Sequence, residues 1–334
     1  ELASLPTQTA DGTSIELWAN IEFPSEIHSA LEKGATGIGL YRTEFLFLAA
    51  EVEPTEDQQC EAYCEALHLL NGQSLTIRTL DLGADKLYQL DKQGYLERPE
   101  PNPFLGCRSI RLCLQNLPLF KTQLRAILRA STEGPLRIMF PLISNVVELR
   151  QAKMILSDVM EDLDEQGIAY RPEIPIGIMI EVPSAALQAA TLAREVDFFS
   201  IGTNDLIQYT VAADRGNERI ASLYTAAHPA VIRLIKEVVR AAARANIEVS
   251  LCGEMASSPE YAMFLVGLGL RSLSVTPPAI LELKKILRSA TIKHCQRIAR
   301  RVGGFDSARE VLNYLREELR KIDRRVAPAT GLAG

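Results

Sequence analysis

Polar residues follow several apolar, β-rich runs of this sequence at the point where each run ends. The run FFSIGTNDL (198–206) is hydrophobic until it reaches Asn204 and Asp205. The same change recurs at Asn20, at Arg42 and Glu44, at Arg78 and Asp81, at Glu181, and at Cys252 and Glu254. Polar residues commonly follow buried strands, but arginines beside carboxylates at successive ends require compensating ligands of both signs. The combination predicts a site for a phosphate-bearing anion and a divalent cation.

Glu181 and Asp205 are the candidate metal ligands. Mg²⁺ prefers oxygen ligands and commonly takes one or two protein carboxylates, with water and substrate oxygens completing its octahedron. As an isolated pair, the two carboxylates are almost as compatible with general acid–base catalysis. The run around Met139 and Phe140 supplies mainly apolar groups instead, which we expect to wall a substrate pocket.

Eight apolar runs must position these residues. They are SIELWANI, GIGLYRTEFL, LTIRTLDLG, LRIMFPLI, IGIMIEVP, FFSIGTNDL, VSLCGEMA and SLSVTP. Nearly continuous hydrophobicity is typical of strands buried on both faces of a parallel sheet. Because helical patterns alternate with the runs, we expect an α/β fold of the TIM (β/α)8 barrel type, whose active site lies at the carboxyl ends of the strands. An open doubly wound sheet is the structural alternative.

Several helix ends can be located in the sequence. Thr55 begins a Thr-x-x-Gln capping box, Gly72 closes that helix, and Ser258 before Pro259 resembles an N-cap. A further helix is expected from about 146 to 166. Amphipathic patterns over 280–287, 292–302 and 307–322 predict extra helices after the last strand. We expect one domain over 1–325, a disordered tail over 326–334, and a loop over the barrel mouth between Asp81 and Pro103.

The composition limits the classes of partner. A net charge of −6 and 47% hydrophobic residues indicate a soluble globular protein without a broad nucleic-acid surface. The six cysteines form no dense framework, which favours free thiols in the cytoplasm. The opening ELASLPTQTADGTS lacks the features of a signal peptide, and no apolar span of membrane length follows. Because the sequence starts without Met, it is compatible with a piece of a longer chain.

Longer motifs in a fixed order carry a family resemblance. GLYRTEFLF, RTLDLGADK, NPFLGCRSIR, LRIMFPLI, DFFSIGTNDL, DRGN and LCGEMA occur in that order. The sequence resembles the carboxyl-terminal, phosphoenolpyruvate (PEP)-binding domain of bacterial PEP-protein phosphotransferases, the enzyme I family of the sugar phosphotransferase system. EVPS and LCGEMA are similar to its nitrogen-related branch. The resemblance implies a PEP-binding TIM barrel.

The resemblance also implies the roles of individual residues. Substrate binding would fall to Arg42, Arg78, Lys86, Arg108, Asn204 and Arg215. Glu181 and Asp205 would bind Mg²⁺, and Cys252 would exchange a proton with the methylene or methyl carbon of the substrate. Guanidinium forks suit a carboxylate and a phosphate better than lysine does. A mostly protonated thiol suits protonation of an enolate at neutral pH.

The sequence departs from the family pattern in two respects. Ile207 stands where members of the family often have threonine, and no Gly/Thr-rich phosphohistidine segment is present. His28, His68 and His294 lie in helical patterns and are expected to be structural or exposed, which leaves His228 as a marginal candidate. The resemblance therefore implies a histidine acceptor on a separate amino-terminal domain, a downstream phosphocarrier protein, pyruvate as product, and a homodimer.

Two other classes of function remain open at this stage. A PEP/pyruvate dikinase or synthase fragment would need a nucleotide-binding partner, and an aldolase would use a Mg²⁺ enolate for aldol cleavage. A non-enzymatic PEP-sensing dimerisation module would bind the ligand without transferring its phosphoryl group.

Overall fold

The computed structural model describes residues 2–49, 53–82 and 102–326, and it confirms the TIM barrel. Parallel strands close in the order β1 to β8, with β1 beside β8. This closure excludes the open doubly wound sheet. The strands are β1 (Glu16–Ile21), β2 (Ile38–Arg42), β3 (Leu75–Arg78), β4 (Leu136–Phe140), β5 (Ile176–Ile180), β6 (Phe198–Ile201), β7 (Glu248–Leu251) and β8 (Ser272–Val275).

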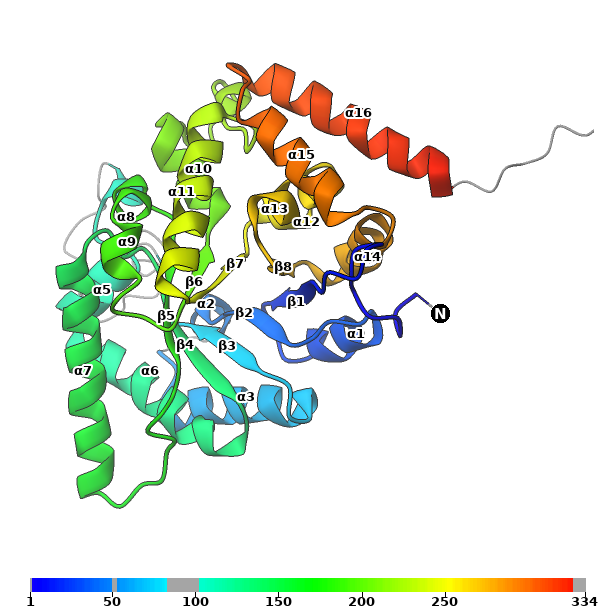
Figure 1. The fold of residues 1–334 in the computed structure, drawn as a ribbon. Helices are drawn as coiled ribbons and strands as arrows, with labels where there is room; N and C mark the ends of the chain where they lie inside the picture. Colours follow the sequence, from blue (N-terminus) through cyan, green and yellow to red (C-terminus); the bar gives the residue numbers. More distant parts are fainter. Residues whose placement is uncertain (1, 50–52, 83–101, 327–334) are drawn as a thin grey trace, which may run out of the picture.

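Helices surround the strands (Figure 1). The α-helices are α1 (Glu26–Glu32), α2 (Glu44–Leu48), α3 (Glu56–Leu70), α5 (Ile110–Gln115), α6 (Leu117–Ala130), α7 (Val146–Glu165), α8 (Pro183–Leu187), α9 (Ala189–Leu192), α10 (Thr203–Val211), α11 (Pro229–Ala245), α12 (Glu254–Ser257), α13 (Ala262–Leu268), α14 (Ile280–Arg288), α15 (Ile292–Val302) and α16 (Ala308–Val326). Short 3₁₀ helices are η1 (Pro103–Leu105), η2 (Ser131–Glu133), η3 (Ala221–Leu223), η4 (Pro259–Tyr261) and η5 (Pro277–Ala279). Within the described ranges, no helix combines the length and apolar character needed to cross a membrane.

Local sequence explains the helix ends. The Thr55 hydroxyl accepts a hydrogen bond from the Gln58 N–H, and Gln58 Oε1 accepts one from the Thr55 N–H, so the predicted capping box is present. The left-handed residue that ends α3 is Asn71 rather than Gly72, which follows it with positive φ. At the other predicted cap, Ser258 precedes η4 and its side chain makes no capping hydrogen bond. The proline at the first turn therefore opens a 3₁₀ turn before α13.

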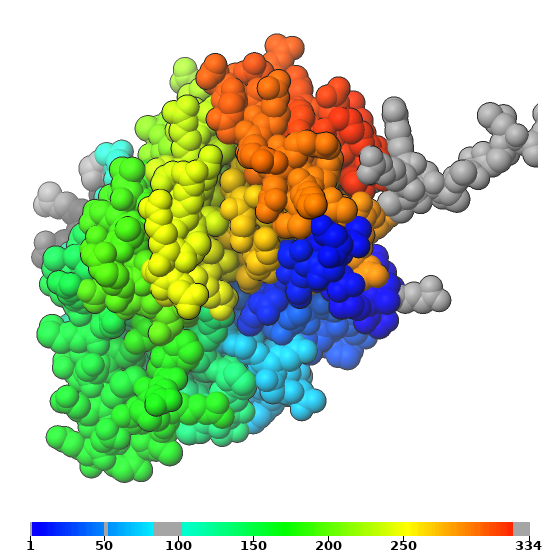
Figure 2. Space-filling view, in the orientation of Figure 1, coloured from blue at the N-terminus to red at the C-terminus, as the bar shows by residue number. Residues whose placement is uncertain are grey.

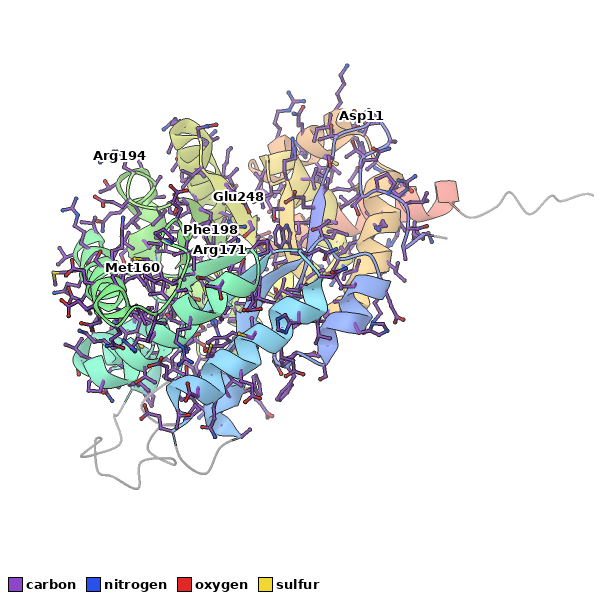
Figure 3. All side chains as sticks on the ribbon, turned by 90° about the horizontal axis from the view of Figure 1, so that it is seen from below. Asp11, Met160, Arg171, Arg194, Phe198 and Glu248 are labelled. Atoms are coloured by element: carbon purple, nitrogen blue, oxygen red, sulfur yellow. The ribbon has the colours of Figure 1, made fainter. Side chains whose placement is uncertain are left out.

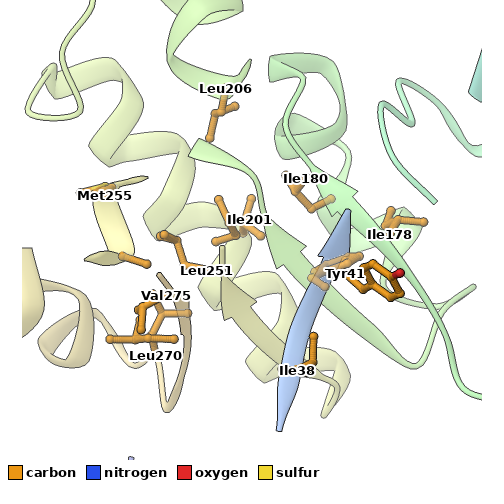
Figure 4. Packing of buried hydrophobic residues seen from close by; sticks show 14 of the residues in the cluster. Ile38, Tyr41, Ile178, Ile180, Ile201, Leu206, Leu251, Met255, Leu270 and Val275 are labelled. Carbon is orange, nitrogen blue, oxygen red and sulfur yellow. The ribbon is translucent and has the colours of Figure 1, made fainter. Parts of the chain in front are cut away.

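The main core lies between the strands and the helices. Residues on the outer face of the barrel, such as Ile178, Ile180, Ile201 and Leu251, are fully buried against helical side chains (Figure 4). Because side chains alternate along a strand, the residues between them point into the barrel. Because residues on both faces are largely buried, the sequence runs are nearly continuously hydrophobic.

The barrel interior is closed at its lower end, where the strands begin. The Arg137 guanidinium lies 3.7 Å from the centroid of the Phe198 ring and pairs with Glu248 at 3.0 Å. Phe198 and Glu248 are labelled in Figure 3, where the ribbon is turned by 90° from the view of Figure 1. Above them, Leu40, Met139, Met179 and Cys252 form a second buried cluster with Phe198. These layers fill the lower barrel and leave only its upper end for a site.

The predicted C-terminal helices are confirmed as α14, α15 and α16. Lys284, in α14, donates from Nζ to the carbonyl oxygens of Ala3 and Leu5, so the N-terminal segment is tied to this helix. Figure 2 shows the N-terminal atoms, in blue, packed against atoms of the C-terminal part of the chain, in orange. Of the expected tail, Val326 belongs to α16 and 327–334 lie outside the described residues. The division into a domain over 1–325 and a tail stays a prediction.

A buried glutamine joins the ends of β2 and β3. Gln123 Oε1 accepts from the Leu80 N–H at 2.8 Å, and Nε2 donates to Thr43 Oγ1 at 3.1 Å. The Thr43 hydroxyl in turn donates to the Arg78 carbonyl at 3.0 Å. The network therefore fixes two strand exits that carry arginines, because each of its buried polar groups needs the others as partners.

We predict that Gln123→Leu lowers the free energy of unfolding by about 1–3 kcal/mol, since the Leu80 N–H is then buried without an acceptor. Urea denaturation followed by circular dichroism measures the change. Gln73→Leu, on an exposed turn, supplies the control and should have little effect. An equal loss in both variants would contradict the proposed buried network.

Candidate functional site

A cavity of about 330 Å³ opens at the carboxyl ends of the strands. Its lining contains eight of the nine residues predicted from the sequence: Arg42, Arg78, Arg108, Glu181, Asn204, Asp205, Arg215 and Cys252. The ninth, Lys86, lies outside the described residues. The structure thus brings together side chains that lie up to 210 positions apart in the sequence, from Arg42 to Cys252.

Two buried arginines share one carboxylate. Arg78 Nη1 pairs with Asp81 Oδ2 at 2.9 Å, and Arg108 Nη2 pairs with Asp81 Oδ1 at 3.0 Å. Arg78 also pairs with Glu44 Oε2 at 2.9 Å, while Glu44 Oε1 accepts from the Asp81 N–H at 2.9 Å. Burial raises the pKa of Asp81, but Arg78 and Arg108 outweigh it, and the pKa of Asp81 is lowered overall. Both arginines are therefore held in place by the same ionised carboxylate.

Arg108 connects this pair to the predicted metal ligands. Its Nη1 lies 3.1 Å from Asp205 Oδ2 and donates to the Tyr209 hydroxyl at 3.1 Å. The Tyr209 hydroxyl donates to the Phe104 carbonyl. Sequence reasoning missed Tyr209, although it follows Asp205 by four residues and so lies on the same face of α10. Tyr209 fixes Arg108 against the segment that precedes it.

Glu181 lies directly after β5, and one of its oxygens is fixed by the backbone. Glu181 Oε1 accepts from the Leu142 N–H at 2.7 Å, and Leu142 has a φ of 52°, unusual for a residue with a side chain. Burial raises the pKa of Glu181 to about 8, and the negative charges of Asp81 and Asp205 add to the effect. Burial also raises the pKa of Asp205, although Arg108 opposes the shift.

A small hard cation fits this arrangement of carboxylates. Within the described part of the chain, no donor reaches the other Glu181 oxygen, Oε2. A Cβ at Gly202 would lie only 2.7 Å from Oε2, so the glycine keeps space open beside it. The described residues contain no cluster of three or more His, Cys, Asp or Glu suited to a metal. Two carboxylates are nevertheless enough for Mg²⁺, which takes its remaining ligands from water and substrate.

Cys252 forms part of the cavity floor. Its thiol is 2% exposed and packs with Leu40, Met139 and Met179. Burial raises its pKa to about 11, and the negative charge of Glu181 contributes to the shift. The thiol lies 3.7 Å from the Ile201 carbonyl oxygen. Cys252 therefore keeps its proton at neutral pH while facing the charged cavity.

The remaining predicted residues lie toward the rim. Asn204 Nδ2 donates to Glu254 Oε1 at 3.1 Å, and the Glu254 N–H donates to Asn204 Oδ1 at 2.9 Å. Arg42 pairs with Glu22 at 2.9 Å. Arg215 follows α10 and is exposed. Glu22 carried no sequence signal, because it lies beyond the expected strand exit.

Other sequence interpretations are corrected by the structure. Met139 and Phe140 are absent from the described lining, and Met139 lies in the buried cluster around the floor. The apolar wall comes instead from Leu40, Phe45, Leu48, Pro103, Phe104 and Met179. Asn20 donates to the carbonyl oxygens of Cys252 and Ser274, which is a structural role. His228 Nδ1 accepts from the Ala230 N–H and caps α11.

Comparison with known families identifies the class of this barrel. The family model described as PEP-utilising enzyme, PEP-binding domain, matches residues 1–292. The chain belongs to this PEP-binding domain family. The family resemblance derived from the motifs is thereby confirmed. The family match covers the barrel and α14, while α16 lies beyond it.

Curated relatives of the domain are considerably longer proteins. The chain is 49% identical over 311 residues to a phosphoenolpyruvate-protein phosphotransferase of Geobacillus stearothermophilus, covering 93% of this chain and 53% of the relative. It is 44% identical over 318 residues to the phosphoenolpyruvate-protein phosphotransferase of Bacillus subtilis strain 168, covering 95% of this chain and 55% of the relative. The chain thus spans about half the length of these relatives.

Solved structures with little sequence similarity share the fold. A Haloferax volcanii malate synthase in a lead(II) complex has a TM-score of 0.51 at 13% identity, covering 80% of this chain and 71% of that one. A pyruvate/acetyl-CoA ternary complex of the Haloferax volcanii malate synthase has a TM-score of 0.50 at 12% identity, covering 92% of this chain and 80% of that one. At such low identity the likeness supports the barrel fold alone.

We predict that Glu181→Gln stabilises the metal-free chain, and that the gain grows as the pH rises from about 5 to about 8. The folded state raises the pKa of Glu181 from 4.5 to about 8, so it retains a proton that the unfolded state has lost. Stability consequently falls across this interval in the wild type, whereas glutamine has no carboxyl to ionise.

Thermal unfolding at pH 5 and pH 8, in the presence of a chelator, measures the difference between the variants. Glu165→Gln, on the exposed last turn of α7, is the matched control and should not change the pH dependence. A Glu181→Gln gain of equal size at both pH values would contradict the raised pKa.

Proposed function

We propose that this chain binds PEP together with Mg²⁺ and donates the phosphoryl group to a histidine on a separate amino-terminal domain, with pyruvate as the product. The observation that carries the proposal is the convergence of four arginines, two candidate metal-binding carboxylates and one protonated thiol on a single cavity. The family membership and the phosphotransferase names of the relatives support it.

The arginines suit an anion with two different acidic groups. PEP carries a phosphate and a carboxylate on a three-carbon skeleton, and a cavity of about 330 Å³ is of the size expected for a small ligand. Planar guanidinium groups make paired hydrogen bonds to both kinds of oxyanion. Arg78 and Arg108 are already oriented by Asp81, so little side-chain entropy is lost when they meet a ligand.

The charges of the lining support a metal requirement. The described lining contains six carboxylates, namely Glu22, Glu44, Asp81, Glu181, Asp205 and Glu254, against four arginines. If all of these groups are ionised, the lining carries more negative than positive charge. It then repels PEP, which is itself a trianion. Mg²⁺, when bound by Glu181 and Asp205, supplies positive charge that neutralises oxygens of the substrate.

The chain itself then performs positioning and proton transfer. The arginines hold the phosphate while the P–O bond to the enol oxygen breaks and a P–N bond to the acceptor histidine forms. The electrons of the broken bond remain on the enol oxygen. The Cys252 thiol gives its proton to the methylene carbon, which yields pyruvate and a thiolate that solvent must reprotonate. A pKa of about 11 keeps the thiol protonated between turnovers.

The acceptor is expected to lie outside this chain. His28, His68, His228 and His294 are all among the described residues, and none belongs to the cavity lining. A histidine on another domain must therefore reach the cavity mouth. The phosphocarrier protein, the homodimer, the cytoplasmic location and the assignment to the sugar or nitrogen branch remain predictions from the resemblance.

We predict that the chain phosphorylates a separately supplied amino-terminal domain of a relative when PEP and Mg²⁺ are present. Arg108→Ala should reduce transfer by about 100-fold or more, because a preorganised donor to the developing charge is lost. Cys252→Ala should slow pyruvate release for lack of its acid. Radiolabelled phosphate on the acceptor and coupled detection of pyruvate measure the two steps.

Arg219→Ala provides the control for this assay, because Arg219 lies near Arg215 in the sequence but is exposed and not part of the described lining. It should retain wild-type transfer. Metal-dependent PEP binding without transfer to any supplied domain would instead favour a sensing module. Undiminished turnover of both site variants would refute the assigned roles.

We also predict that Mg²⁺ binding releases protons at pH 7, because Glu181 has a pKa of about 8 and must ionise to act as a ligand. Calorimetry in two buffers with different ionisation enthalpies measures the number of protons released. The release should decline above pH 8 and be lost in Glu181→Gln. A release that is unchanged in this variant would assign the proton to another group.

A further inference from the structure

Arg42 differs from the buried arginines in its surroundings. Arg78 and Arg108 have side chains only 10% and 9% exposed, and each pairs with two carboxylates. Arg42 lies at the rim with a side chain 32% exposed, and its ion-pair partner is Glu22 at 35% exposure. Because both groups of the outer pair are partly exposed to water, their interaction is weaker than that of the buried pairs and can be exchanged.

The loop after β1 holds Glu22 in position to make this pair. The backbone N–H groups of Glu22 and Phe23 both donate to Glu26 Oε2, at 2.7 and 2.9 Å. The Phe23 ring lies 5.3 Å from the ring of Phe45, which belongs to the cavity lining. Two independent contacts therefore fix the backbone beside Glu22. The backbone of Glu22 is therefore held where its carboxylate can reach Arg42.

We propose that Glu22 is an internal competitor for Arg42, which an incoming anion must displace before this arginine can bind it. The proposal rests on the function proposed above, since it assigns Arg42 to anion binding. Glu22 is thus a specificity-determining residue at the rim. It does not act on the reacting atoms and is not a catalytic residue.

Competition of this kind favours ligands with several negative charges. An anion that also reaches the buried arginines and a metal gains enough from those contacts to displace the partly exposed Glu22 carboxylate. A single phosphate lacks the second acidic group that would hold it in the cavity while Arg42 exchanges partners. Because both ligands must break the same ion pair, Glu22 lowers the affinity for both by a similar factor, and the weakly held simple anion loses the larger share of its occupancy.

The test is Glu22→Gln, which keeps the shape of the side chain and removes its charge. The full chain with Mg²⁺ is titrated by calorimetry with inorganic phosphate and, separately, with PEP. Both dissociation constants should fall, by about two- to five-fold, as expected for removal of one partly exposed ion pair, and the fold-change should be similar for the two anions. In the transfer assay, KM for PEP should fall while kcat stays unchanged.

Two further variants separate this competition from a general change in charge. Glu16→Gln removes a negative charge at the start of β1, at the other end of the barrel, where Glu16 binds the Trp18 indole. It should leave both affinities unchanged. In an Arg42→Gln background, adding Glu22→Gln should also have no effect, because the competed group is gone.

Each arm of the experiment can overturn the proposal. Weaker binding in Glu22→Gln would show that Glu22 orients Arg42 productively, and an equal gain in the Arg42→Gln background would show a simple field effect. Failure of the wild type to bind PEP, with phosphate binding still responding to Glu22→Gln, would refute the proposed function and leave the competition standing. Failure of the wild type to bind either anion would refute both.

Discussion

Asp81 lies buried between Arg78 and Arg108, with one carboxylate oxygen on each guanidinium group. Two buried cations this close would repel each other without a shared counter-charge, and a lone buried carboxylate would be neutralised by protonation. A buried ion pair of this kind adds little net stability, because desolvation cancels most of its attraction. Its physical effect is to fix the orientation of both arginines before any ligand arrives, and the geometry of the cavity depends on this.

The same cavity contains groups whose burial is unfavourable in the free chain. Glu181 is buried and faces the charges of Asp81 and Asp205, and its pKa is raised accordingly. Cys252 is buried on an apolar floor, where its thiolate is disfavoured. Burial of these two groups lowers the stability of the free chain, at the positions where the proposed chemistry needs a metal ligand and a proton donor. The surrounding barrel, with its continuous core, can tolerate that loss.

The sequence predicted the barrel because its strands are hydrophobic on both faces and end in polar residues. It also predicted which residues meet, since the carboxyl ends of parallel strands share one face, and the motif resemblance added Arg108 and Arg215, which lie off the strands. Glu22 and Tyr209 escaped prediction because their partners come from other elements and leave no local pattern. The expected role of Met139 was wrong because a strand residue that points inward can lie beneath a cavity without lining it.

Arg137, Phe198 and Glu248 seal the end of the barrel opposite the cavity. The remaining space beside them is about 10 Å³, too small for a metabolite to pass. A small molecule must therefore enter and leave the cavity through the same opening, at the carboxyl ends of the strands. Any protein that covers the mouth to receive a group from the cavity must arrive after the small molecule has entered. It must also dissociate before the product can leave. The closed end of the barrel therefore fixes the order of binding and release.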